Sequence, residues 1–157
     1  MIYFRYSKGR EFPKMEKAIY FDMDGTIADL YGVDGWLSDL IAENVRPYAE
    51  ARPLVNLSQL ARKLNKLITK GYSVSVISWT SRGGSENYNA AVAEVKKAWL
   101  SKHLPSVKFS EIFIIPYGTP KSTCGNGILF DDEKPNRDEW GAGAHDATEI
   151  FEVLREL

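Results

Sequence analysis

The sequence predicts an α/β protein, a three-layer sandwich whose mostly parallel sheet is covered by helices on both faces. Four short apolar runs, at 18–21, 72–79, 112–115 and 128–130, have the composition of strands buried on both sides. Helical patterns separate the first three runs, and another helical pattern closes the chain. Such alternation is typical of a parallel sheet. A chain of 157 residues suffices for one core, so we expect a single domain spanning 1–157.

The elements follow in order from the strand at 18–21, which ends at Asp22. Residues 29–55 form an irregular insert, interrupted by glycine and proline, with one short amphipathic stretch. Asn56 has the side chain of an N-cap, and the leucines after it recur with a helical period until Gly71 ends the pattern. The second strand then runs over 72–79.

Ser85 begins a second helix, which Pro105 ends. The strands at 112–115 and 128–130 are short and apolar. Asp146, with a glutamate three residues later, forms a capping box for the last helix. These local signals predict the order strand, helix, strand, helix, strand, strand and helix.

The N-terminal residues 1–15 are a mixture of aromatic and basic side chains without a clear period, and we expect them to form an arm. They contain neither a continuous apolar segment nor a small-residue cleavage site, so they do not form a secretory signal. The better-patterned sequence begins near Met15. Two alternatives stay open: Met15 is the natural start, or residues 1–14 belong to the natural chain.

Composition excludes several classes of function. The 20 basic and 21 acidic residues give a net charge of −1, so no overall field attracts nucleic acid or an anionic membrane. No apolar run approaches the ~18 residues that span a bilayer. The single cysteine, Cys124, cannot form an intrachain disulfide. We therefore expect a cytoplasmic protein without a membrane partner or a nucleic-acid partner.

Carboxylates follow the first and the last predicted strands directly. Asp22 and Asp24 come after the first strand, and Asp131 and Asp132 come after the last. Because ligands of parallel sheets bind at the carboxyl ends of the strands, we expect these side chains to converge there. Their mutual repulsion calls for a cation, and oxygen ligands suit Mg²⁺. Aspartate beside glycine also occurs in plain turns, but two such pairs after two apolar strands favour the metal interpretation.

Two further residues belong to the same edge of the predicted sheet. Ser78, near the end of the second strand, offers a hydroxyl and a neighbouring backbone N–H to a phosphate oxygen. Lys121, in the loop before the last strand, can bridge a phosphate and a carboxylate. Thr80 is a rival for Ser78, which we favour because the strand reaches its carboxyl end there. Arg82 is either a secondary substrate contact or an ordinary solvated arginine.

Other motif interpretations fail. An EF-hand loop that starts at Asp22 would need glycine at Ile27 and glutamate at Val33. A phosphate loop over residues 118–122 would need glycine where Pro120 stands. A phospho-accepting receiver domain carries its paired acids first and the single acceptor later, which is the opposite order.

In this order the motifs resemble the four-motif signature of the haloacid dehalogenase superfamily, most of whose members are Mg²⁺-dependent phosphatases with a Rossmann-like core. The resemblance covers residues 17–157. It rests on Asp22-Met-Asp24-Gly25-Thr26, Ser78, Lys121 and Asp131-Asp132. By that resemblance, phosphate oxygens would contact Thr26, Ser78, Trp79 and Lys121.

The resemblance also implies a mechanism. Asp22 would be the nucleophile that forms an aspartyl-phosphate, and Asp24 would protonate the leaving oxygen and then activate water. Gly25 would let the chain turn sharply, so that the Asp24 side chain swings back over the Asp22 site while the Asp24 carbonyl reaches the metal. Mg²⁺ would be held by Asp22, Asp24 and Asp131, with Asp132 behind them; whether Asp131 or Asp132 ligates the ion directly stays open.

Substrate specificity in this superfamily usually comes from a cap inserted after the first motif. Residues 29–55 make only a short cap-like insert, so we expect a fairly open site, or one completed by another subunit; the oligomeric state stays open. Aromatic side chains could flank its mouth and stack a nucleobase, although each also suits simple packing of the insert. The candidates are Tyr31, Trp36, Tyr48 and Trp79.

The spacing between Lys121 and Asp131 leaves no room for a helix. This compression is similar to the 5'(3')-deoxyribonucleotidase branch of the superfamily. We therefore expect a small-molecule phosphate ester as substrate, with a nucleoside monophosphate as the first candidate. A sugar phosphate, a nucleic-acid end, and a non-catalytic phosphate-binding regulatory module are the alternatives; the intact Asp24 argues against the last.

Overall fold

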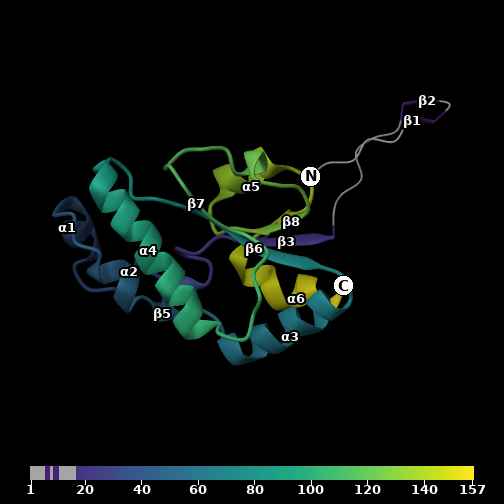
Figure 1. Ribbon diagram of the computed structural model, residues 1–157, viewed down its shortest axis with the longest axis horizontal. Coiled ribbons are helices and arrows are strands. Elements are labelled where there is room, and N and C mark those ends of the chain that lie inside the picture. The colour runs from purple at the N-terminus through teal and green to yellow at the C-terminus, as the bar shows by residue number, and fades with distance from the viewer. Residues whose placement is uncertain (1–5, 8, 11–16) are drawn as a thin grey trace.

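Five parallel strands form the centre of the molecule, in the order β7-β6-β3-β8-β9. The computed structural model describes residues 6–7, 9–10 and 17–157 (Figure 1). The strands are β3 (Ala18–Phe21), β6 (Ser73–Trp79), β7 (Ile112–Ile115), β8 (Ile128–Phe130) and β9 (Ala144–His145). The chain builds outward from β3 to β7 and then crosses back to β8, so the strand order reverses between β3 and β8. In open α/β sheets this switch point is where ligands bind.

Helices and turns connect these strands. They are α3 (Leu57–Thr69), α4 (Glu86–His103), the 3₁₀ turn η1 (Lys121–Thr123), α5 (Lys134–Trp140), the 3₁₀ turn η2 (Ala147–Glu149) and α6 (Ile150–Arg155). The insert contains β4 (Ala28–Asp29), α1 (Trp36–Ile41), α2 (Arg46–Glu50) and β5 (Arg52–Pro53). Ahead of the sheet, β1 (Tyr6–Ser7) and β2 (Gly9–Arg10) pair antiparallel. The other residues of the expected arm, Met15 included, lie outside the described residues.

The sheet is the middle layer of three. One face packs against α3, α6 and the carboxyl-terminal part of α4, in a buried cluster that includes Phe21, Leu64 and Trp99. The opposite face carries a smaller cluster around Tyr20 and packs against Trp140 of α5. Figure 1 shows α5 on one side of the strands and α3 and α6 on the other. This α/β/α sandwich confirms the predicted fold class.

Local signals in the sequence placed most elements. Asn56 Oδ1 accepts from the backbone N–H of Gln59 at 3.0 Å, and Ser85 Oγ accepts from that of Tyr88 at 3.1 Å, so both predicted caps are present. The capping box at Asp146 is also formed, although the residues it caps begin as the turn η2 before they continue as α6. The second strand ends at Trp79, one residue after Ser78.

Among the elements that the sequence did not predict are α5 and β9. Helix α5 has a proline in its first turn and, apart from Trp140, only polar residues, so it shows no apolar period. Strand β9 is two residues long and pairs in parallel with β8. Both elements depend on tertiary contacts more than on local sequence.

The insert packs against α4 and is bonded to its first residues. Its Leu30 and Tyr48 are buried against Tyr88 and Val92 of α4. The Glu43 carboxylate accepts from the backbone N–H and the hydroxyl of Ser85 at 2.7 and 2.8 Å, which ties the insert to the start of α4. No helix among the described residues is long and apolar enough to cross a membrane.

Candidate functional site

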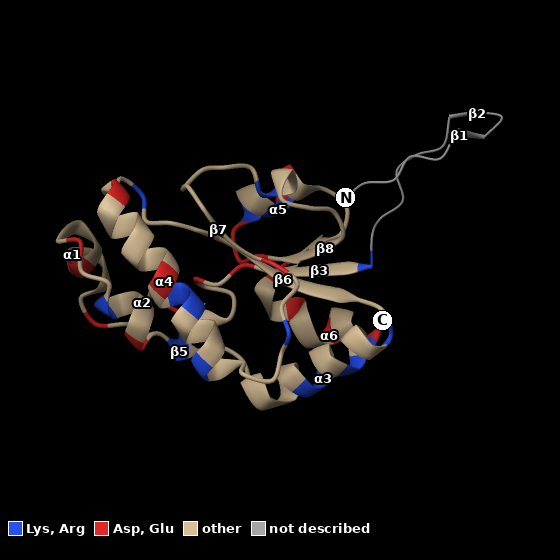
Figure 2. Ribbon diagram, viewed as in Figure 1, with Lys and Arg blue, Asp and Glu red and all other residues tan. Residues whose placement is uncertain are grey.

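Parallel register places the first and fourth motifs together. Phe21 of β3 pairs with Phe130 of β8, and the backbone N–H of Asp22 donates to the carbonyl of Phe130 at 3.0 Å. Asp22 and Asp131 therefore leave the sheet on adjacent strands, on either side of the switch point. Figure 2 shows acidic residues gathered where these strands end.

The turn after β3 needs glycine at position 25. Gly25 has φ +81°, and its N–H donates to the carbonyl of Ala28 at 2.9 Å. A Cβ at this position would collide with the carboxylate of Asp132. The close approach brings the first motif against the fourth, and any side chain at position 25 would push Asp132 away.

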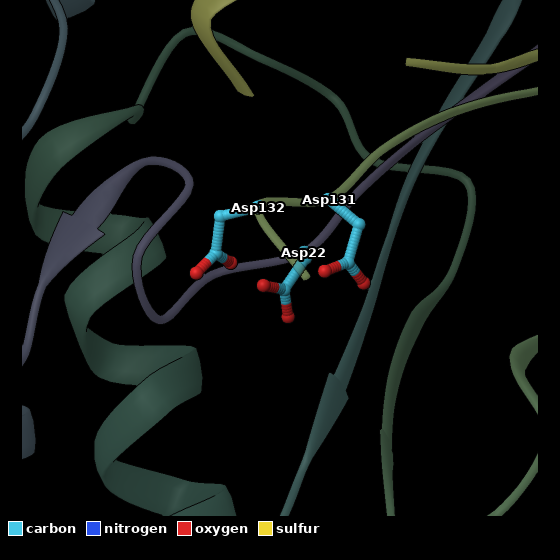
Figure 3. Close-up of side chains that lie close together, drawn as sticks. All are labelled: Asp22, Asp131 and Asp132. Carbon is cyan, nitrogen blue, oxygen red and sulfur yellow. The ribbon is translucent and has the colours of Figure 1, made fainter. Parts of the chain in front are cut away.

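Three carboxylates form the centre of the site. Asp22, Asp131 and Asp132 each offer one oxygen, and these oxygens lie within 4.8 Å of one another. In Figure 3 Asp22 lies between the other two. The buried Thr26 hydroxyl lies 3.1 Å from both Asp22 Oδ2 and Asp132 Oδ1, and it accepts the backbone N–H of Asp132 at 3.2 Å. Of the four carboxylates that were predicted to converge, those of Asp22, Asp131 and Asp132 thus lie together in the structure.

Burial and mutual repulsion disfavour the charged forms of these carboxylates. Burial, reinforced by the charge of Asp22, raises the pKa of Asp132 to about 7. Burial and Asp22 likewise raise the pKa of Asp131 to about 6, although Lys121 opposes the shift. Burial is the main cause of both shifts, and the excess of negative charge that Asp22 contributes adds to it. A bound divalent cation would remove that excess.

Lys121 is one of the compensating cations. Its side chain is buried, and Nζ donates to Asp22 Oδ1 at 2.9 Å and to Asp131 Oδ2 at 2.7 Å. Burial alone would lower the pKa of Lys121, but the two carboxylates outweigh burial and raise it. The sequence predicted a bridge between a phosphate and a carboxylate; the structure has a bridge between two carboxylates, with the ring of Trp79 5.4 Å from Nζ.

Lys96 is the second compensating cation, and sequence reasoning missed it. It lies on α4, is 1% exposed, and donates from Nζ to Asp24 Oδ2 at 2.7 Å. One signal could have found it: Lys96 continues the buried stripe that Tyr88 and Val92 begin and Trp99 extends. A lysine within the apolar stripe of a helix is rarely buried unless a negatively charged or polar group pairs with its ammonium.

Asp24 therefore differs from the other three aspartates. Burial raises the pKa of its carboxyl, and the charge of Lys96 opposes that shift. Its carboxylate is not one of the three that share the possible metal position. The expected metal set of Asp22, Asp24 and Asp131 stays a prediction, while the geometry groups the carboxylate of Asp132 with those of Asp22 and Asp131.

A cavity of about 80 Å³ opens over these groups. Asp22, Asp24 and Lys121 form part of its wall. The rest of the lining is largely aromatic or polar: Leu30, Tyr31, Tyr48, Trp79, Thr80, Ser81, Arg82, Tyr117, Glu133 and Asn136. A wider hollow of about 270 Å³ between α3 and α6 has a basic lining and no acidic residue, so it offers none of this chemistry.

The remaining predicted site residues divide into two groups. Trp79 and Arg82 line the cavity, and the indole of Trp79 donates to the carbonyl of Thr119 at 2.9 Å. Trp36 is not part of the lining; its ring packs edge-on against Tyr31, with 5.0 Å between the ring centroids. Ser78 is fully buried, and its hydroxyl accepts from Lys96.

Thr80, the rival that the sequence left open, lines the cavity, and Ser78 does not. The end of β6 at Trp79 explains the difference. Val74, Val76 and Ser78 share the face that packs against the helices, and the chain passes the end of the strand before Thr80.

No model of a known protein family matches the chain, and no curated protein matches it.

Proposed function

We propose that the protein is a Mg²⁺-dependent phosphomonoesterase of the haloacid dehalogenase type, which works through an aspartyl-phosphate on Asp22. One observation carries the proposal: the carboxylates of Asp22, Asp131 and Asp132 converge beside the buried Lys121 at the switch point of the sheet. The motif order in the sequence and the cavity above these groups support it.

The donor set fits a hard divalent cation. Three carboxylate oxygens within 4.8 Å of one another are oxygen ligands of the kind that Mg²⁺ prefers. Burial, together with the charge of Asp22, raises the pKa values of Asp131 and Asp132, so negative charge is disfavoured at that position without a cation. When bound, the ion would neutralise this charge and draw electron density from a phosphoryl oxygen.

In the first step, a carboxylate oxygen of Asp22 attacks phosphorus. The new oxygen–phosphorus bond forms as the bond to the leaving oxygen breaks, and Asp24 gives its proton to that oxygen. In the second step, water attacks phosphorus, the bond to Asp22 breaks, and Asp24 takes a proton from the water. Inorganic phosphate leaves, and both carboxyl groups return to their starting states.

The cations of the chain make this attack possible. An anionic nucleophile and an anionic ester repel each other, and Lys121, held against Asp22, offsets that repulsion. Thr80 and Ser81 line the cavity just beyond β6, where the hydroxyl of Thr80 can donate to a phosphate oxygen. The backbone N–H groups of these two residues are already used, by the carbonyl of Ile115 at 2.8 Å and by Asn89 Oδ1 at 3.1 Å. Between Ser78 and Thr80, the geometry favours Thr80 as the phosphate contact, because Thr80 lines the cavity whereas Ser78 is fully buried and does not.

A nucleoside monophosphate is the substrate class that we propose. The cavity carries four aromatic rings, and Tyr31 and Tyr117 are each nearly half exposed, at 46% and 48%. Exposed aromatic faces bind a nucleobase by stacking, whichever base it is. The guanidinium of Arg82 lies 5.8 Å from the ring centre of Tyr117, so a positive charge stands at the same rim.

The test is a hydrolysis assay of the purified protein with Mg²⁺ against p-nitrophenyl phosphate, nucleoside monophosphates and sugar phosphates. We expect hydrolysis that EDTA abolishes and that Asp22→Asn reduces to background. Thr80→Val and Ser78→Ala serve as a matched pair, and Thr80→Val should raise KM more. Failure of every ester to react above the Asp22→Asn background would leave the phosphate-binding module as the better interpretation.

A further inference from the structure

Lys96 is a buried charged group that the mechanism above does not use. Its ammonium donates to three acceptors: Asp24 Oδ2 at 2.7 Å, Ser78 Oγ at 2.8 Å and the carbonyl of Trp79 at 2.7 Å. A lysine ammonium has three N–H donors and no acceptor, so these contacts use all of them. Lys96 therefore has no free proton to offer a substrate, and it does not line the cavity.

The contacts of Lys96 join two parts of the site. One partner, Asp24, belongs to the turn after β3, and the other two belong to the end of β6. The next residues after β6, Thr80 and Ser81, line the cavity. The ammonium of Lys96 thus sets the position of the Asp24 carboxyl relative to the end of β6, which lies beside the proposed phosphate position.

The surroundings of Lys96 make this arrangement rigid. The side chain is 1% exposed, and its Nζ lies 4.9 Å from the centre of the Tyr48 ring. A buried ammonium is costly unless its charge is compensated and its N–H groups are bonded. Both conditions hold here, so the buried ammonium is compensated in the position that it occupies.

We propose that Lys96 is a positioning residue, which holds the carboxyl of Asp24 where it reaches the leaving oxygen of the ester. This inference rests on the proposed phosphatase function. If the inference is correct, loss of Lys96 slows the reactions in which Asp24 must protonate the leaving oxygen. It slows the reactions that need no such proton much less.

Esters with different leaving groups distinguish the reactions that need the proton of Asp24 from those that do not. The phenolate of p-nitrophenyl phosphate departs readily without a proton, whereas the alkoxide of an alkyl phosphate or a nucleoside 5'-monophosphate needs one. We expect Lys96→Met to lower kcat/KM for an alkyl phosphate by about 10²-fold, the lower end of what a general acid contributes. For p-nitrophenyl phosphate the loss should be less than about tenfold, because kcat/KM reports only the steps up to the departure of the leaving group.

The neighbouring lysine is the matched control. Lys97 follows on the same helix, but its side chain is 48% exposed, and its charged partner is Glu94 at 3.5 Å. Lys97→Met removes the same charge from the same helix without touching Asp24. Its kcat/KM should equal that of the wild type for both esters.

A double-mutant comparison tests whether Lys96 acts through Asp24. If it does, Asp24→Asn and the double variant Asp24→Asn/Lys96→Met should have the same kcat/KM for the alkyl phosphate within about threefold, because the second change removes nothing further. A full additional loss in the double variant would overturn the proposal. An equal loss for both esters in Lys96→Met would do so too, since it would indicate a purely structural role.

Two further measurements keep the result interpretable. Lys96→Gln retains two N–H donors and replaces Lys96→Met if the latter does not fold, as judged by near-UV circular dichroism. A crystal structure of the folded variant should show the Asp24 carboxylate displaced from Ser78, and an unmoved carboxylate would contradict the proposal. An inactive wild type would overturn the proposed function itself, and with it this inference, whereas an active wild type with no leaving-group effect would overturn the inference alone.

Discussion

The apolar core beneath α3 and the carboxyl edge of the sheet differ in what burial does for them. In the core, Leu60, Leu64 and Leu67 are fully buried against the strands, and their burial stabilises the fold. At the edge, one residue beyond β8, burial raises the pKa of Asp131, which means that folding opposes its charged form. The same depth of burial supports the fold in one region and destabilises a charged group in the other.

The buried charges at the carboxyl edge of the sheet point to a functional site there. Formal charges at the edge are four negative, from Asp22, Asp24, Asp131 and Asp132, and two positive, from Lys96 and Lys121. A fold under selection for stability alone has no use for buried like charges. Their presence at the switch point supports the proposed cation, which would neutralise them.

The largest expected effect is on activity at the edge. Asp22→Asn keeps the shape of the side chain but removes the nucleophile, so phosphatase activity should fall on the order of 10⁴-fold or more. Steady-state assays with p-nitrophenyl phosphate and Mg²⁺ measure the loss, and near-UV circular dichroism checks that the fold is intact. Activity within tenfold of the wild type would place the nucleophile elsewhere.

The next effect is on stability in the core. Leu64 is fully buried on α3, so Leu64→Ala should lower the free energy of unfolding by about 2–5 kcal/mol through lost burial and a cavity. Lys66→Ala, at an exposed position of the same helix, should change it by less than about 0.5 kcal/mol. Urea denaturation measures both. Equal effects at the two positions would contradict the packing described for α3.

At the carboxyl edge of the sheet, a smaller change in the free energy of unfolding is expected, and its sign is opposite. Asp132→Asn removes one of the crowded negative charges, so it should raise the metal-free free energy of unfolding at pH 8 by roughly 0.5–2 kcal/mol. It should also diminish the stabilisation that Mg²⁺ provides. Denaturation with EDTA and with Mg²⁺ measures both quantities, and a destabilised metal-free variant would show that Asp132 has a compensating partner.

The smallest effect is a shift of the melting temperature with pH. The folded pKa values of Asp131 and Asp132, about 6 and about 7, lie above the unfolded value of about 3.9. Between pH 4 and 7 the folded state binds more protons than the unfolded state, so stability falls as pH rises through this window. Thermal melts in EDTA should give a higher melting temperature at pH 5.5 than at pH 8, and Mg²⁺ should raise it mainly at pH 8. A rise in EDTA over the same interval would contradict these pKa shifts.

Local sequence signals were enough for most of the fold. The strands at 112–115 and 128–130 have the predicted limits, and Asn56 and Ser85 cap α3 and α4, because apolar runs and caps act over a few residues. Helix α5 could not be found in this way. Its residues have no apolar stripe, and it is held by contacts with distant parts of the chain, including a hydrogen bond from the indole of Trp140 to the carbonyl of Gly127 at 2.9 Å.

The site was predictable where it follows strand ends and unpredictable where it depends on the third dimension. Asp22 and Asp131 were expected to meet because parallel strands share an edge. Lys96 comes from the middle of a helix, and no local pattern states which charge it faces. The choice between Ser78 and Thr80 depends on where β6 ends, because two residues of the same parity would lie on the same face of a continuing strand. The sequence of an apolar strand does not specify its last residue.

One measurement tests the central claim most directly. During turnover of p-nitrophenyl phosphate with Mg²⁺, borohydride reduces an acyl phosphate and converts the phosphorylated aspartate into homoserine, which mass spectrometry locates in the digested protein. The account predicts homoserine at position 22 and none in Asp22→Asn. Turnover without modification at position 22, or modification of a different carboxyl group, would contradict it.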